Sequence, residues 1–173
     1  MSDLVRVAVD AMGGDYAPVE PVKGAVEAVN ADERIKVQLV GQVDVIEKEL
    51  QKYTYPKERV EIVPATEIIE TGEPPVNAIR HKKDSSIVVG MKKVRYGEAD
   101  AFVSSGSTGA VLVGGQTIVG RIKGVERPPL APLIPTKDGV SLLIDCGANV
   151  DARPSHLCLL YTSPSPRDAH ESR

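Results

Sequence analysis

Two glycine-containing turns and a basic segment carry most of the residues of this chain that could do chemistry. The first turn covers residues 10–15, where a carboxylate, two glycines and a second carboxylate follow an apolar run. Glycines let backbone amides approach a ligand closely, and a helix that starts after the turn adds further N–H donors. The pattern is typical of a small-anion pocket in an α/β protein. Its candidate residues are Asp10, Gly13, Gly14 and Asp15.

The second turn, residues 104–109, is the strongest candidate for anion binding. Hydroxyl groups, helix-start amides and the helix dipole would all face the same ligand there. It is not a Walker loop, because no lysine follows its last glycine, and it lacks the GxGxxG spacing. The alternative is that Ser107 or Thr108 only caps a buried helix. The candidate ligand-binding residues are Ser104, Gly106, Ser107, Thr108 and Gly109.

A basic segment precedes a third candidate group. Between residues 80 and 95 six basic residues accompany a single acid, Asp84. Lys83 lies just before Ser85 and Ser86, where a cation and helix-start amides could together hold a phosphate or steer an acidic partner. The later bases are most simply a solvated helix face; they are Lys92, Lys93 and Arg95.

A third turn, residues 145–149, repeats the opening pattern of an apolar strand, an acid and a glycine turn. In a parallel sheet the loops that follow strands gather at the carboxyl edge, so we expect all three turns to meet there.

Other chemistries find little support. No histidine accompanies Asp10 or Asp145 at ligand spacing, so we expect hydrogen bonds to turn amides rather than a metal site. No Ser/His/Asp triad can be assembled and no serine lies in a GxSxG elbow. An aromatic content of 3% and a net charge of −3 argue against nucleic acid as a partner.

The elements that position these turns alternate between strand and helix, which favours a mostly parallel, doubly wound sheet. Strands are expected at 7–10, 36–40, 59–63 and 101–103, and helices at 18–29, 43–50, 75–82 and 85–94. Asp84 or Ser85 should cap the last of these. A helix over 110–119 is apolar on nearly every side, so we expect it to be buried, with Gly114 and Gly115 allowing close approach. A strand over 140–144 after an Asp-Gly pair predicts a hairpin that adds antiparallel strands to the sheet.

The cysteines and the amino terminus indicate a compartment. Cys146 and Cys158 lack CxxC spacing, which favours reduced thiols. Asp10 interrupts the first apolar run, so no signal peptide is expected, and no segment reaches the ~18 apolar residues of a membrane span. We therefore expect a cytoplasmic protein.

Five segments taken together resemble one family, the bacterial phosphate acyltransferases of phospholipid synthesis (PlsX family). These are residues 9–15 (VDAMGGD), 80–86 (RHKKDSS), 103–110 (VSSGSTGA), 120–128 (GRIKGVERP) and 144–151 (IDCGANVD). In the usual pattern of that family an alanine and an asparagine stand where this chain has Ser105 and Ser107. Serine still hydrogen-bonds at the second position, so we expect tuning there rather than loss.

The resemblance implies a fold related to phosphotransacetylases and isopropylmalate dehydrogenases. It also implies transfer of a fatty acyl group from acyl carrier protein to inorganic phosphate, giving an acyl phosphate without a cofactor. The enzyme would be a homodimer with peripheral membrane contact. Phosphate would attack the thioester directly, with Lys83 and Asn149 as catalytic residues. The alternatives are a short-chain enzyme acting on coenzyme A thioesters and a noncatalytic module that binds phosphate or an acyl carrier.

Residues 1–157 are similar to the amino-terminal part of such an enzyme. Residues 158–173 are short, polar and interrupted by proline, and resemble an unrelated tail derived from an adapter sequence. We therefore expect an incomplete fold with weak or no activity, because much of the family's sheet and its acyl site would lie elsewhere.

Overall fold

A computed structural model describes residues 4–123, 125, 128–137, 139–144 and 146 of the chain. The chain divides into two compact units, residues 1–120 and residues 121–173, and each is described by itself.

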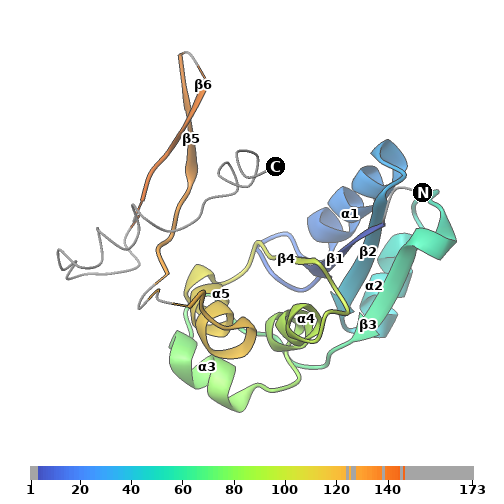
Figure 1. Cartoon of the computed structure of the whole chain (residues 1–173). Helices are drawn as coiled ribbons and strands as arrows, with labels where there is room; N and C mark the ends of the chain where they lie inside the picture. The colour runs from blue at the N-terminus through green and yellow to red at the C-terminus, as the bar shows by residue number, and fades with distance from the viewer. Residues whose placement is uncertain (1–3, 124, 126–127, 138, 145, 147–173) are drawn as a thin grey trace. The chain divides into compact units, whose positions relative to one another are not determined.

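The first unit is built on a four-stranded parallel sheet (Figure 1). Its strands are β1 (Val5–Asp10), β2 (Ile35–Gly41), β3 (Val60–Pro64) and β4 (Ala101–Val103), in the spatial order β3-β2-β1-β4. The chain moves outward from β1 to β3 and then returns to the other side of β1. The strand order therefore reverses between β1 and β4, and in doubly wound sheets ligands bind outside the carboxyl ends of the strands at this reversal.

Helices α1 (Val19–Ala31) and α2 (Val43–Leu50) cover one face of the sheet. Helical spacing predicts a core-facing stripe of Val19, Val22, Val26 and Val29 on α1. Val22, Val26 and Val29 are buried in one cluster with Leu39 of β2 and Ile46 of α2, whereas Val19 at the start of the helix is 41% exposed. This face also takes the odd-numbered residues of β1, since successive side chains of a strand point to opposite sides. The α1 face of the sheet is thus an aliphatic core.

Helix α4 (Ser86–Arg95) covers the opposite face, where its Val89 and Val94 pack near Ala8 and Val40. Helices α3 (Pro75–His81) and α5 (Thr108–Gly114) pack against α4 in turn. A short 3₁₀ turn, η1 (Lys57–Arg59), leads into β3. Helices on both faces confirm the doubly wound α/β class.

The helix expected over residues 110–119 differs from its prediction. Helix α5 starts at Thr108 and continues beyond Gly114 as a π-helical segment, η2 (Gly115–Val119). Only Ala110 and Gly114 of this stretch are buried, because α3 and α4 cover one side of it. Gly114 does allow close approach, since a Cβ there would overlap Met91 Sδ, but nothing lies within 4 Å of a Cβ at Gly115.

The second unit contains a hairpin of β5 (Leu133–Thr136) and β6 (Gly139–Leu142), antiparallel with Leu133 opposite Leu142. The predicted hairpin is confirmed. Within the second unit β5 and β6 form a two-stranded sheet. Each strand has four residues. The expectation that this hairpin adds strands to the parallel sheet stays a prediction.

The turn between α1 and β2 yields a pH prediction. Arg34 donates from Nε and Nη2 to the Asp32 carboxylate, at 3.0 Å to Oδ1 and 2.6 Å to Oδ2. These hydrogen bonds lower the pKa of Asp32 from 3.8 to about 2. Because the pKa is lower in the folded chain, the resulting stabilisation is present above pH 3.8 and is lost as the pH falls through about 2.

We expect an NMR titration of the Asp32 carboxyl from pH 6 downward to show a midpoint near 2 in the native chain. Arg34→Gln should return it towards 3.8, the ordinary value, whereas Lys23→Gln, which removes a charge elsewhere on the surface, should leave it unchanged. A midpoint of 3.8 in the native chain would contradict the bidentate contact.

Candidate functional site

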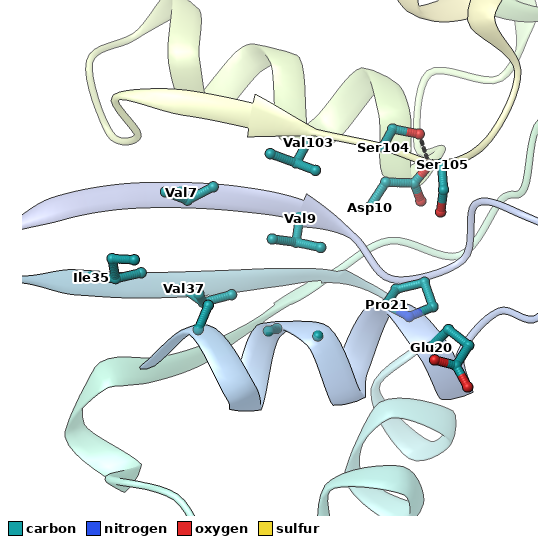
Figure 2. A pocket seen from close by; sticks show the side chains of 13 residues that line it. Val7, Val9, Asp10, Glu20, Pro21, Ile35, Val37, Val103, Ser104 and Ser105 are labelled. Atoms are coloured by element: carbon teal, nitrogen blue, oxygen red, sulfur yellow. Dashed lines mark hydrogen bonds between the residues drawn. The ribbon is translucent and has the colours of Figure 1, made fainter. Parts of the chain in front are cut away.

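A buried carboxylate joins the first two turns at the point where the strand order reverses. Asp10, the last residue of β1, is 1% exposed. Its Oδ2 accepts a hydrogen bond from Ser104 Oγ at 2.7 Å, and its Oδ1 accepts from the Met12 amide at 3.1 Å (Figure 2). The Gly106 amide donates in turn to Ser104 Oγ at 3.0 Å. The prediction that these two turns meet is therefore confirmed.

The two glycines of the first turn are required by this closeness. A Cβ at Gly13 would overlap Asp10 Oδ2 and would lie 2.9 Å from the Gly106 amide nitrogen. Gly14 has φ of +101°, a conformation that side chains disfavour. The Ser105 hydroxyl donates to the Gly13 carbonyl at 2.9 Å and adds a second tie between the turns. Sequence reasoning had assigned no contact to Ser105.

At the start of α5 the serine hydroxyl is hydrogen-bonded, whereas two backbone amides are not. Ser107 is 3% exposed and its Oγ accepts from the Ala110 amide at 3.3 Å, so the capping role proposed as the alternative is observed. The amides of Thr108 and Gly109 are the next two of the helix and have no partner among the described residues. The atoms left for an anion are therefore backbone N–H groups.

The start of α4 is also capped by a serine, but here the first helical amide is used, because the Ser86 amide donates to the Glu67 carbonyl at 3.3 Å. Ser85, rather than Asp84, is the N-cap: its Oγ accepts from the Val88 amide at 3.4 Å and donates to the Lys82 carbonyl at 2.9 Å. Ser86 is 2% exposed, and its hydroxyl has no partner within the described part of the chain. Lys83 is exposed, with its Nζ donating to the Ile79 carbonyl at 3.0 Å.

Among the described residues, no hydrogen bond or ion pair links Lys83, Ser85 or Ser86 to residues 104–109. The two helix starts are connected through packing instead, because α4 and α5 belong to one apolar cluster. Pro75 at the start of α3 also reaches the start of α5, where a Cβ on Gly109 would lie 2.6 Å from its Cγ.

A strap between residues 66–67 and 84–85 was missed by sequence reasoning. The Thr66 amide donates to Asp84 Oδ2 at 3.0 Å, and the Asp84 amide donates to Glu67 Oε2 at 2.9 Å. Hydrogen bonds from Thr66, the side chain first, lower the pKa of the Asp84 carboxyl. The position of Thr66 two residues beyond β3 places it at the carboxyl edge of the sheet, but nothing in the sequence pairs it with Asp84.

The neighbouring Lys82 is held in the same region. Its Nζ donates to the Ile68 carbonyl at 2.6 Å and pairs with Glu73, which lowers the pKa of the Glu73 carboxyl. Lys82 is therefore neutralised, which leaves Lys83 as the candidate cation beside the start of α4.

The remaining candidate site residues are Asp15 and those of the third turn. Asp15 is exposed in the first turn. Asp145 and Asn149 lie outside the described residues, so the third turn stays a prediction, as does the tail over residues 158–173. Within the described ranges, no cluster of three or more His, Cys, Asp or Glu side chains is placed to hold a metal ion. No helix in these ranges has the length and hydropathy needed to cross a membrane.

The sequence of the chain is similar to that of known proteins. Residues 5–161 match the family described as "Fatty acid synthesis protein". The chain is 51% identical over 154 residues to a protein from Alkaliphilus oremlandii named "Phosphate acyltransferase", covering 88% of this chain and 45% of that protein. A protein of the same name from Clostridium beijerinckii is 50% identical over 153 residues, covering 88% and 46% respectively. The chain thus spans a little under half the length of these relatives.

A solved structure shows the same fold at much lower identity. A phosphotransacetylase from Streptococcus pyogenes aligns with a TM-score of 0.66 and 17% identity, covering 91% of this chain and 51% of that one. At this identity the likeness concerns the fold alone, and it confirms the predicted similarity of fold to phosphotransacetylases.

The contact between Asp10 and Ser104 can be tested by a double-mutant cycle. Asp10→Ala leaves the Ser104 hydroxyl and the Met12 amide without an acceptor, so we expect a loss of about 1–3 kcal/mol in the free energy of unfolding. Ser104→Ala in the Asp10→Ala background should cost less than in the native chain, with a coupling of about 0.5–3 kcal/mol. Urea unfolding measures both.

The control pairs Asp10→Ala with Thr117→Val, a substitution in η2 that removes a hydroxyl bonded only to the Val113 carbonyl. This pair should be additive, because the two sites share no partner. Additive effects of Asp10→Ala and Ser104→Ala would show that the two turns are held by other contacts.

Proposed function

The chain belongs to the PlsX family of fatty acid synthesis proteins, and we propose that it forms the phosphate-binding side of an acyltransferase. The reaction is transfer of a fatty acyl group from acyl carrier protein to inorganic phosphate, giving an acyl phosphate. The observation that carries the proposal is the pair of unpartnered amides at Thr108 and Gly109, which start a helix beside the strand-order reversal. Such amides are a ready anion site.

The protein has to position the phosphate rather than activate it. Phosphate is already a nucleophile near pH 7, so one of its oxygens attacks the thioester carbonyl carbon, a C–O bond forms, and the C–S bond breaks. The carrier thiolate leaves and takes up a proton from solvent. The protein's part is to fix the phosphate near the carbonyl and to stabilise the oxyanion that develops. Amides and cations perform both tasks without proton transfer.

The candidate residues are proposed either to contact the phosphate or to hold in place the groups that do. The amides of Thr108 and Gly109 and the Nζ of Lys83 are proposed to contact the phosphate, with the free hydroxyl of Ser86 at the neighbouring helix start. Asn149, the other catalytic candidate, lies outside the described residues. Gly13, Gly14, Asp15 and Gly106 are proposed to shape the pocket. Ser85 and Ser107 act as caps that hold their helix starts in place.

Asp10 is proposed to act through its neighbours rather than on the ligand. Both of its oxygens already accept hydrogen bonds, and a carboxylate facing phosphate would repel it. Asp10 instead orients Ser104 and, through the Gly106 amide, the chain that leads into α5. It is a positioning residue in this scheme.

The partners follow from the same proposal. Acyl carrier protein is the acyl donor, and exposed cations such as Arg80 and Lys83 suit its acidic surface. A homodimer, peripheral membrane contact and a cytoplasmic location complete the proposal. We expect little or no turnover by the 173-residue chain alone, because the relatives named phosphate acyltransferase are more than twice as long as the region they share with it.

Phosphate binding can be tested at the first residue of α5. Proline is tolerated at this position and lacks an N–H, and Ser107 before it already has the extended backbone that proline requires. We expect phosphate to shift the NMR amide signals of Thr108 and Gly109 in the native chain. Thr108→Pro should weaken binding roughly tenfold, about 1.4 kcal/mol, whereas Thr108→Ala should preserve it.

A charge control accompanies this series. Lys83→Ala should weaken phosphate binding, and Lys48→Ala on the exposed side of α2 should not. Equal phosphate affinity in Thr108→Pro and Thr108→Ala would remove the start of α5 from the site.

The substrate is tested in a chimera, in which residues 5–157 of this chain replace the matching region of the Alkaliphilus oremlandii relative. We expect acyl phosphate to form from long-chain acyl carrier protein and phosphate, with much less from short-chain coenzyme A thioesters. The reverse preference would establish the coenzyme A alternative. Binding of the carrier without product would establish the noncatalytic one.

A further inference from the structure

The strap between residues 66–67 and 84–85 is anchored on the sheet. Thr66 lies two residues beyond β3, and the Ala65 amide before it donates to the Gly41 carbonyl of β2 at 2.9 Å. Gln42 Nε2 donates to the Thr66 carbonyl at 3.3 Å. The Thr66 amide and hydroxyl in turn donate to Asp84 Oδ2, at 3.0 Å and 2.5 Å. Asp84 is therefore tied to the carboxyl edge of the sheet.

The backbone at the start of α4 is held from the same side. The Glu67 amide donates to the Asp84 carbonyl at 3.2 Å, and Glu67 Oε2 accepts from the Asp84 amide at 2.9 Å. The Ser86 amide donates to the Glu67 carbonyl at 3.3 Å, and Glu67 forms a parallel bridge with Ser85. Residues 66–67 thus fix the chain where it enters the helix.

Lys83 is the cation that this strap places. It directly precedes Asp84, and its carbonyl accepts from Lys92 Nζ at 3.3 Å. Its own Nζ donates to the Ile79 carbonyl at 3.0 Å. The backbone of Lys83 is therefore held by α4 on one side and by the strap on the other. A cation whose position is fixed before a ligand arrives loses less conformational entropy on binding.

An acid at position 84 is unexpected on charge alone. Asp84 is the one acidic residue between residues 80 and 95. Hydrogen bonds from Thr66, the side chain first, lower the pKa of its carboxyl, so it is ionised at neutral pH. A carboxylate beside a phosphate site repels the ligand. The hydrogen bonds that Asp84 makes therefore point to a geometric role.

We propose that Asp84 is a positioning residue of the phosphate site, which fixes Lys83 and the start of α4 through its hydrogen bonds to Thr66 and Glu67. Asp84 does not itself contact the phosphate. This role rests on the proposed function, because that function assigns Lys83 to the phosphate. Every contact in the argument lies within the first unit of the chain.

Two substitutions of Asp84 separate geometry from charge. Asp84→Ala and Asp84→Asn both remove the negative charge, but asparagine keeps a carbonyl oxygen that can accept from Thr66. We expect Asp84→Ala to weaken phosphate binding by about fivefold or more, and Asp84→Asn to bind phosphate at least as tightly as the native chain. The measurement is the phosphate dissociation constant, taken from the NMR amide shifts of Thr108 and Gly109 in the 173-residue chain.

Two further variants accompany this pair. Thr66→Val removes one donor to Asp84 and keeps the side-chain shape, so it should weaken phosphate binding by a smaller factor even if Asp84→Ala does not fold. Asp100→Ala is the matched control, since the Asp100 carboxylate accepts from the Arg6 amide at 2.8 Å and from Arg6 Nη2 at 2.9 Å. This pair lies at the amino ends of β1 and β4. Asp100→Ala should lower the Tm and leave the phosphate dissociation constant unchanged.

Four outcomes would contradict the positioning role. Tighter phosphate binding by Asp84→Ala would show that repulsion outweighs geometry. Equal weakening in Asp84→Asn and Asp84→Ala would remove the hydrogen bonds to Thr66 from the explanation, and equal weakening in Asp100→Ala would indicate a general loss of stability. Native affinity in both Asp84→Ala and Thr66→Val would overturn this role alone and leave the proposed function standing. A native chain without phosphate-dependent shifts would instead overturn the proposed function, and this role with it.

Discussion

The hydrogen bond between Asp10 and Ser104 is the interaction on which the rest of the site depends. It joins two turns that are 94 residues apart in sequence and that follow the adjacent strands β1 and β4. A buried carboxylate is unfavourable unless its oxygens are satisfied, and here a hydroxyl and an amide satisfy them. Each partner is thereby fixed in place. The requirement for glycine at position 13 follows, since a side chain there would occupy the space of the carboxylate.

A second consequence concerns which atoms are left for a ligand. Serines at two helix starts could bind an anion or cap a helix, and sequence alone supports both uses. The structure shows that Ser85 and Ser107 are caps, with their hydroxyls turned towards amides three residues ahead. Capping satisfies one amide and leaves the amides at the first two helical positions without an intrahelical partner. The hydroxyl groups thus build the site, and the backbone supplies the donors.

Sequence reasoning was strongest where one periodicity dominated. Helix α2 over residues 43–50 and the buried stripe of α1 were predicted because apolar spacing identifies one face. The burial of the helix after Gly109 could not be predicted in the same way. An all-apolar helix shows no face, and how many neighbours cover it is a property of the tertiary structure.

The site was predictable to a similar extent. Because loops after parallel strands share one edge of the sheet, the closeness of Asp10 and Ser104 could be predicted without any knowledge of side-chain contacts. The strap from Thr66 to Asp84 escaped notice because residues 65–75 have no period, and polar pairing between loops leaves no pattern in sequence. For the same reason the neutralisation of Lys82 by Glu73 was not foreseen, and a basic run of residues gave too large an estimate of the free positive charge.

The candidate site and the apolar cavity on the α1 face both follow from the order of the strands. A reversal beside β1 opens a crevice at the carboxyl edge, because the loops after β1 and β4 leave in opposite directions. The same reversal moves the later helices to the α4 face, so the α1 face beside β4 receives no helix from this part of the chain. Asp10 and Ser104 line that cavity together with Val9 and Val103. The carboxyl edge and the α1 face therefore share these two residues, so a change at Asp10 or Ser104 affects both.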